Sequence, residues 1–275
     1  MEISNIIGYI LAVFVGMTLG MLGSGGSILS VPILVYMMGI EPALATAYSL
    51  FVIGTTSLIG GVHKAKQKLV DFNKVILFGI PAVISVFITR KFIVPRIPKI
   101  IFTTENFILS KSILIMIVFA FVMIFASFRM IKPFKETTIS GEEKLNYFKV
   151  VTMGILIGLI SGFVGAGGGF LIVPTLLFFA KIPMKIAVGT SLFIVSLQSL
   201  IGFTGDIMGN QIIDWELLQV FTLASIAGVF IGNFISRKVD EEKLKTGFGW
   251  FVLAMGIYII IKEVFVSLYF TKYNF

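Results

Sequence analysis

The 275-residue chain contains no cysteine, a single histidine and few charges, since Asp, Glu, Lys and Arg together make up 13% of it. Without cysteine, neither disulfide bonds nor thiolate metal sites can form. The HExxH zinc motif is missing, and the one histidine, His63, has no evident nucleophile as a partner. We therefore expect no enzyme, no metal site and no cofactor.

Acidic residues are missing from the centres of the long apolar runs. A transport mechanism coupled to protons or sodium through a carboxylate in the membrane therefore has no obvious residue to use.

Apolar residues dominate the chain, with 57% hydrophobic content and a mean hydropathy of +1.03. The uncharged runs 43–62, 186–205 and 217–236 each span 20 residues. A helix of about 20 apolar residues crosses a hydrocarbon core of about 30 Å. The sequence thus predicts an all-α polytopic membrane protein.

The net charge of +8 comes from basic residues in short loops, which form no continuous basic face. Membrane topology explains this charge better than nucleic-acid binding does. We therefore expect a lipid bilayer as the surroundings and no nucleic acid as a partner.

An internal duplication emerges when the sequence is shifted against itself by 142 residues, because 16 of 38 positions from Gly23 to Gly60 are then identical. The predicted organisation is a first membrane repeat (1–129), a charged linker (130–149) and a second membrane repeat (150–275). Each repeat contains five apolar segments. Their expected ranges are 5–22, 27–38, 43–62, 73–94 and 107–129 in the first repeat, and 148–164, 168–180, 185–204, 216–236 and 246–268 in the second.

An odd number of segments in each repeat predicts that the two repeats have opposite orientations. Loops 63–74, 129–149, 181–185 and 237–245 then lie on one side and collect 15 of the 22 Lys and Arg residues. The positive-inside rule makes this side cytoplasmic, including the linker 130–149, and the expected location is the bacterial inner membrane. Loop 90–106 is discordant, because it is basic and falls on the outer side.

Two glycine-rich stretches, "GSGGS" at 23–27 and "GAGGG" at 165–169, interrupt apolar runs at equivalent places. The segments that follow them, 27–38 and 168–180, are too short to cross a bilayer. We therefore expect re-entrant or broken helices whose tips meet in mid-membrane, where irregular backbone must line a cavity or be buried in protein. The free N–H groups at the start of such helices favour a small anion.

Other interpretations of these residues remain open. Gly and Ser also serve close packing of membrane helices, and Ser or Thr hydroxyls often bond to their own helix. A nucleotide site is disfavoured because no Walker lysine follows the glycines. Asp71 and Asp214 stand where helix caps are expected, and His63 fits an interfacial position.

The candidate substrate-binding residues share a place in, or just after, the two glycine stretches. Gln198 is added because burying its amide in a span requires a polar partner. The set comprises Gly23, Ser24, Gly25, Gly26, Ser27 and Ser49 in the first repeat, and Gly165, Ala166, Gly167, Gly168, Gly169, Thr190, Ser191 and Gln198 in the second.

The motifs "GMLGSGGSILSVPIL" (20–34) and "GFVGAGGGFLIVPTL" (162–176), with "ATAYSLF" (45–51) and "AVGTSLF" (187–193) after them, resemble the TauE/SafE sulfite exporter family, also called TSUP. The resemblance covers both repeats. It implies movement of sulfur-containing anions such as sulfite, thiosulfate or sulfoacetate across the cytoplasmic membrane, usually outward. The first copy departs from the family's "GTS" pattern, since it has Ala47-Tyr48-Ser49.

The expected function is thus a secondary permease that works by alternating access around the paired glycine loops. An anion-selective channel and a permease for another small anion, such as a carboxylate, are the alternatives. The sequence leaves the oligomeric state open.

Overall fold

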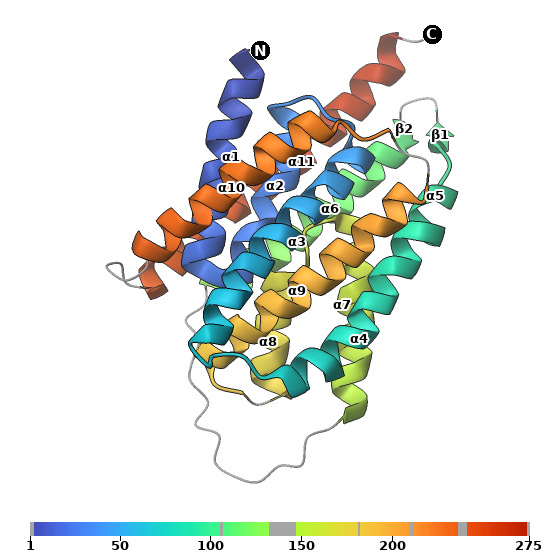
Figure 1. The fold of residues 1–275 in the computed structure, drawn as a ribbon. Helices are drawn as coiled ribbons and strands as arrows, with labels where there is room; N and C mark the ends of the chain where they lie inside the picture. The colour runs from blue at the N-terminus through green and yellow to red at the C-terminus, as the bar shows by residue number, and fades with distance from the viewer. Residues whose placement is uncertain are drawn as a thin grey trace.

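The fold is a bundle of helices (Figure 1), seen in a computed structural model that describes residues 3–104, 107–131, 147–180, 182–209, 212–235 and 241–273. The first half contains α1 (Ile3–Leu22), the 3₁₀ helix η1 (Gly23–Leu29), α2 (Ser30–Tyr36), α3 (Pro42–Lys66), α4 (Phe72–Ile88), the π-helical η2 (Thr89–Ile93), α5 (Val94–Arg96), β1 (Ile100–Thr104), β2 (Phe107–Ser110) and α6 (Lys111–Ile131). The second half contains α7 (Tyr147–Val164), α8 (Gly169–Phe179), α9 (Met184–Ile207), α10 (Trp215–Ile235) and α11 (Glu241–Tyr273).

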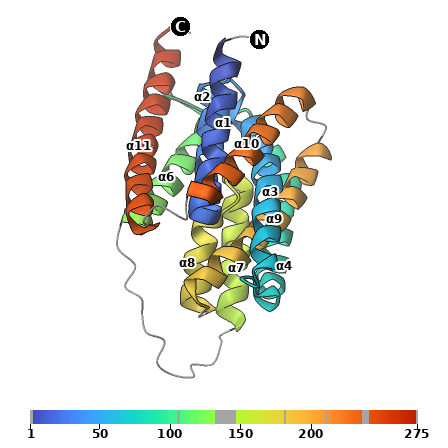
Figure 2. The same cartoon turned by 60° about the vertical axis from the view of Figure 1, so that its left-hand side comes forward.

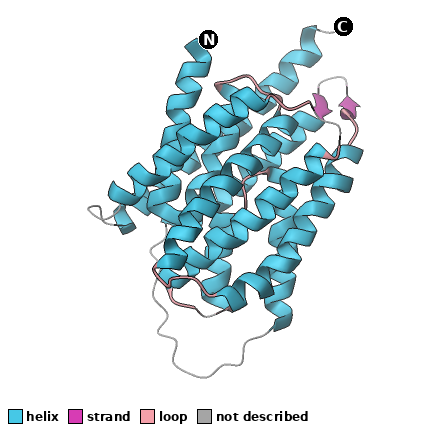
Figure 3. Ribbon diagram, in the orientation of Figure 1, coloured by secondary structure: helices cyan, strands magenta, loops and turns pink. Residues whose placement is uncertain are grey.

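The prediction of an all-α polytopic membrane protein is confirmed. In the described part of the chain, seven helices are long and apolar enough to cross a membrane, and three shorter apolar helices accompany them. All ten expected segments are present as helices. The β1–β2 hairpin, which the apolar pattern did not predict, lies at one end of the bundle (Figure 3).

Two acidic residues cap helices, as their positions predicted. The carboxylate of Asp71 accepts a hydrogen bond from the backbone N–H of Lys74 at 3.2 Å, at the start of α4. That of Asp214 accepts one from Leu217 at 3.0 Å, at the start of α10. Each cap satisfies a backbone donor that has no partner within its helix.

The helices break at both glycine motifs. α1 ends at Leu22, and Gly23 takes a positive φ of 69°; α7 ends at Val164, and Gly165 takes a φ of 74°. After the first break the chain turns back along α1, because a Cβ on Gly8 would lie 2.7 Å from the Met38 side chain. The first short α-helix begins at Ser30 rather than at the expected Ser27, since η1 precedes it.

The helices pack in four main pairs. α1 runs parallel to α10 and α4 runs parallel to α7, with glycines between the backbones: a Cβ on Gly16 would lie 1.8 Å from the Ser225 carbonyl, and one on Gly158 would lie 2.4 Å from that of Ala82. Small residues let membrane helices approach this closely.

The other two pairs are antiparallel. Gly54 of α3 faces Leu200 of α9 while Gly202 of α9 faces Leu50 of α3, and α6 packs against α11 in the same sense. Figure 2 shows the α6–α11 pair at one side of the bundle and α4 at the other. The pair α3–α9 lies between them and carries 10 of the 22 buried polar or charged side chains of the described residues.

The linker expected at 130–149 lies largely outside the described residues. Its first two positions, Met130 and Ile131, complete α6, and its last three, from Tyr147, begin α7. The division of the chain into two membrane repeats therefore stays a prediction.

Candidate functional site

The two glycine motifs meet in the interior of the bundle. The Ser27 hydroxyl donates a hydrogen bond to the carbonyl oxygen of Ala166 at 2.7 Å, across 139 positions of sequence. The Gln198 amide donates to the carbonyl of Gly167 and, at 3.3 Å, to the hydroxyl of Ser161. Ser27 and Gln198 are fully buried. Two of the predicted side chains therefore join the motifs to each other and to α9.

Most glycines of the second motif are in close contact with α3 and α9. A Cβ on Gly165 would lie 2.5 Å from Thr46, and one on Gly167 would lie 2.8 Å from Ile53 and 3.2 Å from the Ser199 hydroxyl. One on Gly168 would meet Ser161 at 3.1 Å. Close packing, one of the open interpretations, is thus part of what these glycines do.

In the first motif, Gly26 packs against the backbone of Thr18 and Leu19 in α1. Ser24 and Gly25 lie in η1, and the surroundings of these two residues are outside the described part of the structure.

The hydroxyl-bearing candidates on α3 and α9 differ in what their hydroxyl groups bond to. The Thr190 hydroxyl accepts a hydrogen bond from the backbone N–H of Asp71 at 3.0 Å. Ser191 donates to the Val188 carbonyl of its own helix at 2.8 Å. Ser49 is buried, and its hydroxyl has no partner among the described residues. Among the described candidate residues, the Ser49 hydroxyl and the Oε1 atom of Gln198 are therefore buried polar groups that a ligand could use.

Tyr48 shows why the first copy departs from the "GTS" pattern. Its hydroxyl accepts a hydrogen bond from the backbone N–H of Asp214 at 2.6 Å. Thr190 does the same for Asp71 in the other half. Tyr48 and Thr190 are equivalent under the 142-residue shift, so the two residue types do one structural task.

A cavity of about 360 Å³ opens beside the place where the motifs meet. Gly23 of the first motif and Gly169 of the second both line it, together with apolar residues of α8 and α9. This volume lies within the range of about 300–1,000 Å³ that is usual for small-molecule sites.

Four basic side chains line this cavity: Lys64 at the end of α3, Arg129 at the end of α6, Lys185 at the start of α9 and Lys245 near the start of α11. None of its lining residues in the described chain is acidic. All four stand in or beside the loops that the charge pattern placed in the cytoplasm. A cavity with charges of one sign concentrates ions of the other sign, so this one attracts anions.

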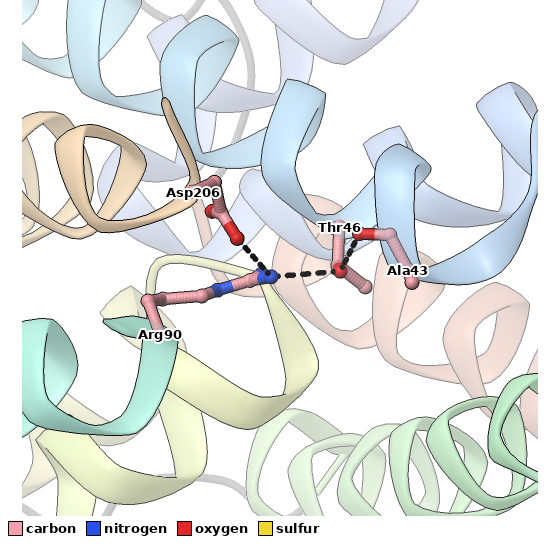
Figure 4. A network of polar contacts seen from close by, with 4 residues as sticks. All are labelled: Ala43, Thr46, Arg90 and Asp206. Atoms are coloured by element: carbon pink, nitrogen blue, oxygen red, sulfur yellow. Dashed lines mark hydrogen bonds and ion pairs between the residues drawn. The ribbon is translucent and has the colours of Figure 1, made fainter. Parts of the chain in front are cut away.

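A buried ion pair lies at the opposite end of α3 and α9, and the sequence analysis missed it. Nη1 of Arg90 is 3.4 Å from Oδ1 of Asp206 and donates a hydrogen bond to the Thr46 hydroxyl at 3.1 Å (Figure 4). The Arg90 and Asp206 side chains are only 0% and 2% exposed. In the sequence, Arg90 falls where the expected segment 73–94 and loop 90–106 overlap, and Asp206 lies just past the expected segment 185–204.

A second buried carboxylate was also missed. Glu263 of α11 is 8% exposed and accepts a hydrogen bond from the Tyr36 hydroxyl at 2.7 Å. The ammonium of Lys262 lies 4.0 Å from the centre of the Tyr36 ring. Asp206 and Glu263 both lie near the end of an apolar helix and not at its centre, so the sequence analysis, which considered only the centres of the apolar runs, did not include them.

Comparisons with known proteins agree with this architecture. The family model described as "Sulfite exporter TauE/SafE" matches residues 9–259. A probable membrane transporter protein of Xylella fastidiosa (strain 9a5c) is 28% identical over 90% of this chain and 91% of its own length. The probable membrane transporter protein YunE of Bacillus subtilis is 25% identical over 94% and 99%. No solved structure matches the chain.

Proposed function

Since the chain belongs to the sulfite exporter TauE/SafE family, we propose that it is a secondary permease that moves small sulfur-containing anions out of the cell by alternating access. That it is a multi-pass transporter of the bacterial inner membrane follows from the family and from the seven candidate spans in the described residues. The anion, the direction and the mechanism are the proposal. Sulfite, thiosulfate and organosulfonates such as sulfoacetate are the expected substrates.

The cation-lined cavity is the observation that carries this proposal. Lys64, Arg129, Lys185 and Lys245 give it a positive potential, and Gly23 and Gly169 form part of its wall. An anion drawn into the cavity therefore arrives where the two glycine motifs meet. Backbone N–H groups and serine hydroxyls are suitable donors for sulfite and sulfonate oxygens.

The cavity is one-sided along the α3–α9 pair. Thr46 and Lys64 are 18 positions apart on α3, which corresponds to about 27 Å of helix. Lys64 lines the cavity, whereas Thr46 contacts the buried pair Arg90–Asp206. A path that is open at one end and closed by buried charges at the other is what a carrier in one of its two states requires.

Opposite orientation of the two repeats is part of the proposal. Helices that are equivalent under the duplication, α3 with α9 and α6 with α11, pack antiparallel. Each parallel pair joins one helix of the first half to one of the second: α1 packs on α10, and its equivalent α7 packs on α4. Both relationships are expected of repeats related by a two-fold axis in the membrane plane, the arrangement on which rocking carriers are built.

Transport by the purified protein in reconstituted vesicles tests the proposal. Vesicles are loaded with labelled sulfite, thiosulfate, sulfate, taurine, sulfoacetate or succinate, and efflux is measured with and without the same unlabelled anion outside. We expect saturable efflux of at least one sulfur anion, accelerated by the external anion. Single-channel currents would instead indicate a channel, and efflux of succinate alone would indicate a carboxylate permease.

A further inference from the structure

The Arg90–Asp206 pair is incompletely bonded for two buried charges. Nε and Nη2 of Arg90 and Oδ2 of Asp206 have no hydrogen-bond partner among the described residues. The single contact of 3.4 Å is longer than the 2.7–2.9 Å or so that is usual for such pairs, and it is not the bidentate form that Arg and carboxylate prefer. Two donors and one acceptor therefore remain buried and unused.

The pair lies next to the second glycine motif. Thr46, which accepts a hydrogen bond from Arg90, is the residue that Gly165 approaches most closely, since a Cβ on Gly165 would lie 2.5 Å from its Cβ. Gly205 brings α9 close to η2, because a Cβ there would be 3.0 Å from that of Arg90. An anion that passes the glycine motif would therefore reach the guanidinium of Arg90 next.

Few other charges face Asp206. From α6, Lys111 acts electrostatically on both Asp206 and Arg90, and Glu41, just before α3, acts on Lys111 in turn. Lys91 of η2 turns its ammonium over the rings of Phe87 and Phe92, at 5.4 and 5.5 Å. In the described parts of η1, α3, α4, α7 and α8, the other elements that pack on α9, no charged residue forms an ion pair with Asp206.

These observations lead beyond the proposed function, on which the inference rests. We propose that the transported anion displaces Asp206 from the guanidinium of Arg90 and that Asp206 then takes up one proton, so that anion and proton cross the membrane together. The Asp206 carboxylate thus holds the place of the anion when the site is empty of substrate, and Arg90 is a specificity-determining residue for anions.

Charge balance is the physical reason for the proton. Without the anion, the positive guanidinium and the negative carboxylate sum to zero. A monovalent anion at Arg90 would leave one uncompensated negative charge in a buried site, which is strongly unfavourable. One proton, donated by a hydronium ion of the solvent to Oδ2 of Asp206, restores neutrality and leaves a water molecule behind. Net export then occurs when the outward anion gradient exceeds the inward proton gradient.

The test uses Asp206→Asn in reconstituted vesicles, with labelled sulfite as the first probe and the anion panel above as alternatives. Two assays are run on each protein: accumulation driven by an acidic outside, and exchange of anion at equal pH on both sides. For one coupled proton, a gradient of about one pH unit sustains about tenfold accumulation, since both correspond to about 1.4 kcal/mol. We expect the unmodified protein to reach this and a proton ionophore to abolish it.

For Asp206→Asn we expect loss of the pH-driven accumulation with retention of exchange, because the neutral amide stands for the permanently protonated acid. Asp214→Asn is the matched control, since it alters a helix cap that asparagine can also form, and it should keep both activities. Arg90→Gln should lose exchange as well.

Three results would overturn the inference. If accumulation by the unmodified protein does not depend on the pH gradient, anion transport is not coupled to protons. If Asp206→Asn retains pH-driven accumulation, Asp206 is not the residue that binds the coupled proton. Equal loss of both activities in a folded Asp206→Asn, monitored by its elution and melting, would make the pair merely structural. Absence of any anion transport by the unmodified protein would instead overturn the proposed function itself, and this inference with it.

Discussion

Ser27 and Ala166 are joined by a hydrogen bond of 2.7 Å, from the serine hydroxyl to the alanine carbonyl, although they belong to different halves of the chain. Ser27 is fully buried and Ala166 is 1% exposed. A carbonyl at this depth has no water to bond with, and in an apolar environment an unpaired polar group is costly. The contact therefore ties the first glycine motif to the second.

Replacing Ser27 with alanine should destabilise the protein, because it leaves the Ala166 carbonyl without this donor. We expect a loss of about 1–3 kcal/mol in unfolding free energy, the usual cost of an orphaned buried acceptor. Thermal melting of the purified protein in detergent measures this. Thr152→Ala is the control, since its exposed hydroxyl bonds only to Phe148 of its own helix, and its melting should hardly change. Equal melting of the two variants would contradict the account.

Gly165 and Gly39 separate the effect of backbone conformation from that of space. Both have positive φ, 74° and 68°, but Gly165 is packed against Thr46 whereas no atom lies within 4 Å of a Cβ on Gly39. Gly39→Ala should cost only the conformational strain, about 1–2 kcal/mol. Gly165→Ala should cost more, because α3 must also move away. Melting temperature and yield of folded protein compare the two; a Gly39 variant that is as damaging as the Gly165 variant would show that contact with α3 is unimportant.

The Arg90–Asp206 pair should show strong coupling in stability. Arg90→Gln alone leaves a buried carboxylate unpaired, and breaking such a pair costs about 3–5 kcal/mol. The double variant with Asp206→Asn removes both charges and should recover much of that loss. Unfolding in mixed micelles of increasing denaturant measures the two single variants and the double variant against the unmodified protein. Additive losses in the double variant would indicate that the two charges do not interact.

Cavity lysines should control anion affinity. Lys64→Gln and Lys185→Gln each remove one positive charge from the cavity, and about 0.5–1 kcal/mol per partly solvated charge corresponds to a roughly two- to fivefold weaker apparent affinity. The effect should shrink as salt is raised, because ions screen the cavity charge. Lys66→Gln, on the same helix end but outside the cavity, serves as the control. An equal effect of Lys66→Gln would indicate a general surface potential.

Apolar run length predicted the helices well, because a membrane span is set by its own composition. α3 was expected at 43–62 and is Pro42–Lys66, and α10 was expected at 216–236 and is Trp215–Ile235. The helix breaks at both glycine motifs were also predictable, since the positive φ angles that end these helices depend on the glycines themselves and not on distant contacts. The β1–β2 hairpin was not, because its residues fall in the discordant loop 90–106 and in the expected segment 107–129, where nothing in the apolar pattern indicates strands.

The burial and pairing of Arg90 and Asp206 could not be predicted from each segment taken separately. Arg90 follows an apolar run without interruption and Asp206 ends another, so each looked like the start of a loop. Only the packing of η2 against α9 makes them partners, and that contact joins residues 116 positions apart. The roles of Thr190 and Tyr48 were hidden for the same reason, because each hydroxyl serves the other half of the chain.

Alternating access is the central claim, and the absence of cysteine makes it directly measurable. Leu177, which lines the cavity, is replaced with cysteine, and the rate of its reaction with a membrane-impermeant maleimide is measured from each side of the membrane. Alternating access predicts fast labelling from the cytoplasmic side, and a change in that rate when a transported sulfur anion is present and shifts the carrier between its two states. A rate that no transported anion changes would contradict it.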